Sequence, residues 1–154
     1  MNVSASVIID CPQSDVFAFV SDVANMPAWV SGVTSATMLS EEMHEGALFT
    51  CEYTRNWRRA DIELRVFTFD PPNVFGTEMA RGPFSFEGRL ELEAVDGGTK
   101  VTNYIVADPD SLSTRFAAVV FGPFTRGSMR KRLTRELEAL AAAVKGDATK
   151  GADA

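Results

Sequence analysis

The pattern of apolar and polar residues changes from a strand period to a helical period within the first 25 residues. Every second residue from 3 to 9 is apolar, which predicts a β-strand with one buried face. Valine and phenylalanine then recur at helical spacing over residues 16–23. Pro27 interrupts this pattern, because proline supplies no backbone amide to a helix interior. We therefore expect one strand followed by two short helices, the second of them an irregular piece over residues 26–29.

Residues 33–107 carry strand patterns separated by turn residues. The predicted strands are 33–41, 46–56, 59–69, 73–80, 83–95 and 99–107. The segments between them are rich in Gly, Pro, Asn and Asp, and Gly97-Gly98 can supply the positive φ angles that a tight hairpin needs. Within the strands, apolar residues alternate with charged ones. This alternation is typical of an antiparallel sheet with one buried face and one wet face.

Helical spacing returns after residue 108. Apolar residues form one stripe over 112–120 and a second over 129–144, and Gly122-Pro123 between them predicts a kink or a short break. Gly146 is the predicted end of the long helix. Residues 146–154 carry nothing to bury, so they are predicted to form a disordered tail after one folded domain over 1–145.

The long helix also carries charged residues away from its apolar stripe. Arginines recur between positions 126 and 135. Because charges on an amphipathic helix usually face water, we interpret this run as a solvated surface that Glu136 and Glu138 balance. The full order of elements is a strand, a broken helix, six strands and a long helix. This order predicts an α+β fold with a seven-stranded antiparallel sheet.

The composition narrows the class of protein. The 154 residues are 45% hydrophobic and 23% charged, as in an ordinary soluble domain, and the formal net charge is −6. A nucleic-acid binder needs cationic surface to displace counterions from phosphates, so an acidic chain argues against that class. No stretch approaches 18 apolar residues, and no basic segment precedes an apolar one at the N-terminus. We expect no membrane span and no signal peptide, and hence a cytoplasmic protein.

Metal and cofactor chemistry is not indicated. Cys11 and Cys51 are the only cysteines, and His44 is the only histidine. Two cysteines are too few for a disulfide scaffold, and we interpret them as reduced core thiols. A zinc site is not expected, because every ligand beyond these three residues would have to be a carboxylate. The sequence predicts no cofactor.

The predicted sheet offers more apolar surface than the predicted helix can cover. A seven-stranded antiparallel sheet twists and curls, and its inward face has several times as many positions as the long helix has apolar anchors. The 11 phenylalanines and 6 methionines supply bulk that either closes the remaining space or lines a hollow. The residues by themselves leave both outcomes open.

Five short motifs stand in a characteristic order along the chain. They are Ile9-Asp10-Cys11-Pro12, Asn25-Met26-Pro27-Ala28-Trp29, Gly82-Pro83-Phe84, Gly97-Gly98-Thr99-Lys100 and Gly122-Pro123-Phe124. In this order, across residues 3–145, they resemble the START-like (SRPBCC) superfamily, and in particular its polyketide cyclase/dehydrase branch. The resemblance implies the helix-grip fold, in which a curved sheet wraps around the long C-terminal helix and encloses an apolar cavity.

Three residues on the predicted strands are candidates for catalysis. Tyr53 and Arg55 share one face of their strand, and if that face is inward they bring a hydroxyl and a guanidinium into an apolar space. A buried arginine needs a partner, so the alternative is that Arg55 reaches water at the strand end. Glu78 is the third candidate, but both faces of its strand are equally apolar. Which face of that strand points inward is therefore left open.

A larger set of residues is predicted to line the ligand pocket. The members are Trp29, Phe49, Tyr53, Arg55, Phe84, Phe86, Asn103, Phe116, Val120 and Phe124. Those at position 29 and at 116–124 are implied by the resemblance, because in the family these regions border the mouth of the cavity. For each residue of the set, ordinary core packing or a satisfied polar group is the alternative.

Three functions are compatible with these observations. The first is binding of a small hydrophobic molecule, aromatic or lipid-like, in an internal cavity. The second is an enzyme of the polyketide cyclase/dehydratase kind, with Tyr53, Arg55 or Glu78 supplying acid–base or oxyanion help. The third is a partner-binding module with a filled core, in which Trp57 contacts a partner such as a second copy of the chain. Because a fold does not decide its function, the sequence leaves the question of catalysis open.

Overall fold

The structure is a computed structural model of the chain that describes residues 2–81, 85–107, 119 and 125–152. The strands are β1 (Asn2–Ile9), β2 (Val33–Met38), β3 (Leu48–Arg55), β4 (Arg58–Asp70), β5 (Val74–Arg81), β6 (Phe86–Val95) and β7 (Gly98–Ala107). The helices are α1 (Gln13–Ser21), the 3-10 helix η1 (Val23–Asn25), α2 (Met26–Trp29) and α4 (Arg126–Ala152). The predicted Gly122-Pro123 break and most of the 112–120 stripe lie outside the described residues.

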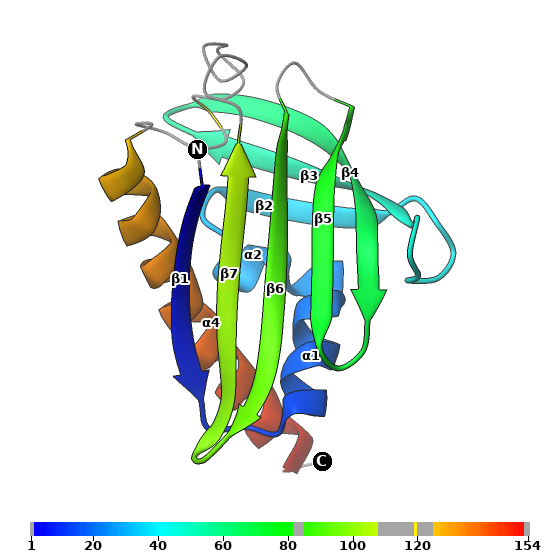
Figure 1. The fold of residues 1–154 in the computed structure, drawn as a ribbon. Helices are drawn as coiled ribbons and strands as arrows, with labels where there is room; N and C mark the ends of the chain where they lie inside the picture. Colours follow the sequence, from blue (N-terminus) through cyan, green and yellow to red (C-terminus); the bar gives the residue numbers. More distant parts are fainter. Residues whose placement is uncertain (1, 82–84, 108–118, 120–124, 153–154) are drawn as a thin grey trace.

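The seven strands of the described chain form one antiparallel sheet in the order β1-β7-β6-β5-β4-β3-β2. Strands β2 to β7 are neighbours in sequence order, and β1 closes against β7. Asp96 and Gly97 form the predicted tight β6–β7 turn, and Gly97 and Gly98 supply positive φ angles of 89° and 134°. Figure 1 shows the sheet curled so strongly that β2 and β3 cross the direction of β7. The predicted α+β fold with a curved seven-stranded sheet is confirmed.

The helical segment after β1 is divided into short helices, as Pro27 predicts. Asp22 ends α1 and caps η1, since its Oδ1 accepts a hydrogen bond from the Ala24 amide at 3.1 Å. Pro27 lies in the first turn of α2, where a missing amide is tolerated. Residues 26–29, predicted to be irregular, therefore form one short helical turn instead.

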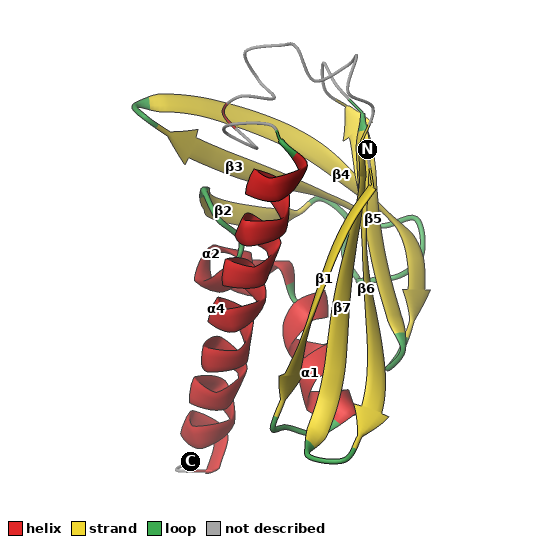
Figure 2. Ribbon diagram, turned by 60° about the vertical axis from the view of Figure 1, so that its left-hand side comes forward, coloured by secondary structure: helices red, strands yellow, loops and turns green. Residues whose placement is uncertain are grey.

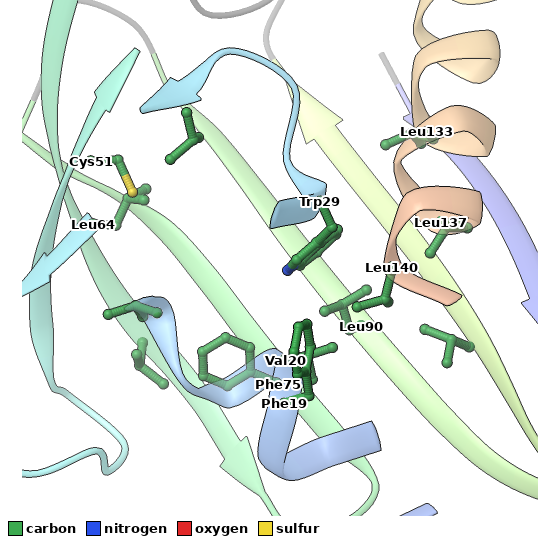
Figure 3. Packing of buried hydrophobic residues seen from close by; sticks show 14 of the residues in the cluster. Phe19, Val20, Trp29, Cys51, Leu64, Phe75, Leu90, Leu133, Leu137 and Leu140 are labelled. Carbon is green, nitrogen blue, oxygen red and sulfur yellow. The ribbon is translucent and has the colours of Figure 1, made fainter. Parts of the chain in front are cut away.

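Helix α4 covers the concave face of the sheet. It packs along β1 and also contacts α2 and α1 (Figure 2). Its apolar stripe is buried, with Leu133, Leu137 and Leu140 each at most 2% exposed. Figure 3 shows these leucines on the side of α4 that faces Trp29 and Leu90. The helix-grip arrangement of one long helix held by a curved sheet is thereby confirmed.

An aromatic cluster fills the end of the concave face that lies under α1. Phe17 of α1, Phe69 of β4 and Phe75 of β5 stand with ring centroids 5.7 to 6.4 Å apart, in tilted and edge-to-face geometry. Such pairs are favourable for aromatic rings. Phenylalanine bulk therefore closes this end of the space between helix and sheet.

The long helix ends later than predicted. α4 continues through Gly146 to Ala152, so the helix end predicted at Gly146 is wrong. A glycine in an exposed helix costs only about 1 kcal/mol relative to alanine, which is too little to stop a helix by itself. The described helix thus includes residues predicted to lie in a disordered tail, and the division of the chain at residue 145 stays a prediction. No helix within the described residues is long and apolar enough to cross a membrane.

Candidate functional site

A cavity of about 100 Å³ lies between α4, α2 and the concave face of the sheet. Most of its wall is apolar, with side chains from α1, α2 and α4 and from the strands. The principal apolar residues are Val20, Met26, Phe49, Phe75, Leu90 and Leu133. An apolar cavity of about 150 Å³ admits benzene, and the space observed here is about two-thirds of that volume, which matches a short alkyl chain or part of a small ring.

The cavity exists because two small residues face each other across neighbouring strands. Thr77 of β5 pairs with Gly88 of β6, and Gly88 pairs in turn with Ile105 of β7. All three residues line the cavity. Two residues further along the same two strands, Phe75 of β5 pairs with Leu90 of β6, and both side chains are buried. The hollow therefore lies where the sheet carries a threonine and a glycine in place of large side chains.

A buried ion pair forms one side of the cavity wall. Arg132 Nε lies 2.8 Å from Glu136 Oε1, and the two residues are only 7% and 5% exposed. Arg132 Nη2 also donates to the Ser31 carbonyl at 3.1 Å, and the Ser31 backbone amide donates to Glu136. Charges taken out of water require such partners. The interpretation of this stretch as a solvated surface is therefore wrong for Arg132 and Glu136.

Burial changes the proton affinity of the polar groups beside the cavity. Burial raises the pKa of Glu136, and the Arg132 guanidinium acts in the opposite direction. Burial also raises the pKa of the Tyr53 hydroxyl, which lies within electrostatic range of both charges. Tyr53 is therefore neutral at physiological pH and available as a hydrogen-bond donor.

One polar group of the cavity wall is buried without a hydrogen-bond partner among the described residues. The Trp29 Nε1 donor is fully buried and unpaired. Figure 3 shows this nitrogen on the edge of the indole ring that points away from α4. No side-chain hydrogen bond within the described chain involves the Tyr53 hydroxyl or the Asn103 amide, and both residues line the cavity. Since buried polar groups are normally paired, the unpaired Trp29 donor is the exception that this wall presents.

The structure brings together five of the predicted ligand-binding residues. They are Trp29, Phe49, Tyr53, Phe86 and Asn103. Four others, Phe84, Phe116, Val120 and Phe124, lie outside the described residues. The remaining one, Arg55, does not line this cavity. Its Nε donates to the Val119 carbonyl at 3.1 Å, and its side chain lies in a groove outside α2.

Glu78 is not brought to the site. Phe75 and Thr77 give β5 its inward face, and Glu78 lies on the opposite face. There its carboxylate pairs with Arg65 at 3.2 Å, and the Glu78 side chain is 36% exposed. Of the three catalytic candidates, Tyr53 alone lines the cavity.

Sequence reasoning missed the two charged residues of the site. Arg132 and Glu136 are spaced i, i+4 and directly precede Leu133 and Leu137 of the apolar stripe. A pair of opposite charges on the border of a buried stripe is the signal that could have found them. Its burial depends on α2, which packs against α4 at this point.

Comparison with protein families gives a match over nearly the whole chain. A family model described as "Polyketide cyclase / dehydrase and lipid transport" matches residues 1–145. No curated protein sequence matches the chain.

Solved structures with the same fold are distant in sequence. TTHA0849 from Thermus thermophilus is 15% identical with a TM-score of 0.75, covering 96% of this chain and 99% of that one. Ara h 8.0201 is 11% identical with a TM-score of 0.68, covering 95% and 98%. The di-domain ARO/CYC StfQ from the steffimycin biosynthetic pathway is 12% identical with a TM-score of 0.66. There the match covers 96% of this chain and 52% of StfQ, so the chain spans about half of the di-domain protein.

Proposed function

The chain belongs to the polyketide cyclase/dehydrase and lipid transport family, and from this premise we propose that it binds a small hydrophobic molecule, aromatic or lipid-like, in the cavity under α4. One observation carries the proposal. An apolar hollow is bordered by the buried, unpaired Nε1 donor of Trp29 and by the polar side chains of Tyr53 and Asn103. A filled core would leave neither the space nor the unpaired donor.

The polar groups decide how tightly such a guest binds. An aromatic ring buries about 150 Å² of apolar surface, which contributes about 4 kcal/mol at 25 cal/mol per Å². That amount alone corresponds to a Kd of about 1 mM. Hydrogen bonds to Tyr53 or Asn103 add about 1 kcal/mol each. The proposed guest is therefore mostly apolar, with one or two hydrogen-bonding atoms.

The two tryptophans provide a direct assay. Trp29 lines the cavity, whereas Trp57 is fully exposed at the β3–β4 turn. In a Trp57→Phe variant, the remaining fluorescence reports on the cavity wall alone. Titration with a small aromatic guest such as 4-phenylbutanamide is expected to change this fluorescence saturably.

A variant that fills the hollow makes the assay decisive. Gly88→Val adds bulk to the cavity wall, where the first added carbon would lie 3.1 Å from the flexible end of Ile105. We expect at least a tenfold loss of guest affinity, because the guest and the valine compete for the same space. Ser35→Val introduces the same residue at an exposed position of β2, away from the cavity, and is the control. Equal binding by Gly88→Val and Ser35→Val would contradict the proposal.

Acid–base catalysis in the same cavity is a second candidate function. The observation that favours it is a buried carboxyl, Glu136, whose pKa burial raises, near the neutral hydroxyl of Tyr53. Groups with perturbed pKa values beside a pocket are suited to hold or move a proton during catalysis. Turnover of an aromatic ketide that disappears in Tyr53→Phe would support an enzyme. Saturable binding without turnover would support a binding protein.

The compartment and the oligomeric state complete the proposal. Cys11 and Cys51 are both free and buried, which is consistent with a reducing, cytoplasmic setting. Trp57 is wholly exposed, and a homodimer would cover it. Sedimentation of the parent and of Trp57→Phe tests this point, since loss of a dimer in the variant is the expected result.

A further inference from the structure

A groove on the outer side of α2 adjoins the cavity. It has a volume of about 590 Å³ and runs between α2, the loop after it, and α4. Figure 2 shows α2 lying directly beside α4. The groove and the cavity share Trp29, Val30, Arg132 and Glu136 as lining residues. The same four residues therefore border both an apolar interior and an outer groove.

The groove is cationic although the chain is acidic. Its described lining residues include four cations, Arg55, Lys131, Arg132 and Arg135, and a single carboxylate, that of Glu136. Four positive charges less one negative charge leave +3, in a chain whose net charge is −6. Glu136 is already engaged with Arg132. No ion pair within the described residues involves Lys131, Arg135 or Arg55.

The cations of the groove repel one another. Lys131 and Arg135 are spaced i, i+4 on α4, a like-charge arrangement that destabilises a helix. Arg55 reaches the same place from β3, and its pKa is lowered, first by burial and then by repulsion from Arg132 and Arg135, with the Glu136 carboxylate acting in the opposite direction. An anion in the groove would relieve this repulsion.

We propose that the groove binds the carboxylate of an amphipathic ligand whose apolar part occupies the cavity. This inference rests on the proposed function, and it adds the charge of the ligand and the place where that charge lies. A carboxylate suits the groove because the planar guanidinium of an arginine can donate two parallel hydrogen bonds to it. The two parts of the ligand would join beside Arg132 and Glu136, because these residues line both spaces.

Two ligands of the same shape test the inference. 4-Phenylbutyrate carries a carboxylate, and 4-phenylbutanamide carries a neutral amide on the same phenyl chain. With Trp29 fluorescence in the Trp57→Phe protein, we expect the acid to bind at least tenfold more tightly than the amide at low salt. Raising the salt to about 0.5 M should remove most of this preference, because exposed charges are then screened.

Two double variants with equal changes in net charge locate the effect. Lys131→Gln with Arg135→Gln removes two groove cations, and each unit charge at about 5 Å in water is worth about fourfold in affinity. We expect the affinity for the acid to fall about tenfold and the affinity for the amide to stay unchanged. Lys100→Gln with Arg130→Gln removes two exposed cations outside the groove and should change neither affinity by more than twofold.

The outcomes separate this inference from the function on which it rests. If the amide binds as tightly as the acid to the parent protein, the groove proposal is overturned while cavity binding stands. An equal loss of acid binding in both double variants also overturns it, since only net charge would then matter. If neither ligand binds, cavity binding itself fails and the groove proposal falls with it. The salt dependence of the parent protein keeps the test valid even if a variant folds poorly.

Discussion

The buried Arg132–Glu136 pair makes the strongest prediction about stability. Arg132→Met removes the guanidinium and leaves the Glu136 carboxylate buried without its ion-pair partner. Loss of one member of a buried pair costs about 3–5 kcal/mol. With a urea m value of about 2 kcal/mol/M, the midpoint of unfolding should fall by about 2 M. Urea titration followed by far-UV circular dichroism measures this shift.

The loss of stability caused by Arg132→Met should depend on pH. Burial raises the pKa of Glu136 above its value in the unfolded chain, and removal of Arg132 leaves that effect unopposed. The native state then binds the Glu136 proton more tightly than the unfolded state does, so stability falls as pH rises above the ordinary carboxyl pKa of about 4.3. The difference between parent and variant is therefore expected to be larger at pH 8 than at pH 5.

Two further variants show whether the pair acts as a unit. The double variant Arg132→Met with Glu136→Leu removes both charges, and we expect it to recover most of the stability that Arg132→Met loses. Arg65→Met breaks the exposed pair with Glu78, whose side chains are 48% and 36% exposed, and should cost less than about 1 kcal/mol. If Arg132→Met cost no more than Arg65→Met at either pH, the reasoning from burial would be refuted.

Three other predictions concern the core and its turns. Gly98→Ala should lower the free energy of unfolding by several kcal/mol, because the added carbon would overlap the end of β1. In Gly97→Ala the added carbon meets nothing within 4 Å, so this variant should lose only about 1 kcal/mol of stability, for its positive φ. Equal losses of stability in thermal unfolding would contradict this. Thr99→Val removes the buried hydrogen bond from the Thr99 hydroxyl to the Cys11 carbonyl, 2.8 Å long, and should cost about 1–3 kcal/mol in urea titration. Burial raises the pKa of Cys51 to about 12, so a thiol reagent at pH 8 should modify this cysteine only after the protein unfolds. Rapid reaction in the folded protein would show that the Cys51 thiol is accessible to solvent.

The sheet was predictable because most of its strands alternate strictly. In β3 and β4 the buried residues pair directly, as Phe49 with Leu64 and Cys51 with Ile62. The period fails at the end of β4, where a bulge between Val66 and Thr68 shifts the register. Beyond the bulge, Phe69 turns inward to join the aromatic cluster. A period of two residues does not predict where an extra residue enters a strand.

The inward face of β5 was not predictable, for a related reason. Val74, Gly76 and Glu78 compete with an equally apolar set on the other face. In the structure the Phe67 ring lies over Gly76 on the outer face, so closely that an added Cβ would come within 2.7 Å of it. An aromatic side chain therefore covers a glycine on the outer, wetter face of the sheet. This contact between β4 and β5 exists only once the register is set, and neither strand alone signals it.

The location of the cavity and the burial of its ion pair could not be predicted, because both depend on contacts between residues that are distant in sequence. Thr77 and Gly88 carry no signal in their own strands, yet their pairing leaves the space that a ligand needs. Arg132 and Glu136 belong to a charged run that would be solvated on an isolated helix, and α2 buries them. The same two residues then border both the apolar cavity and the cationic groove. The proposed site for an apolar body beside a negative charge depends on this packing, whereas helical periodicity alone would place both charges in water.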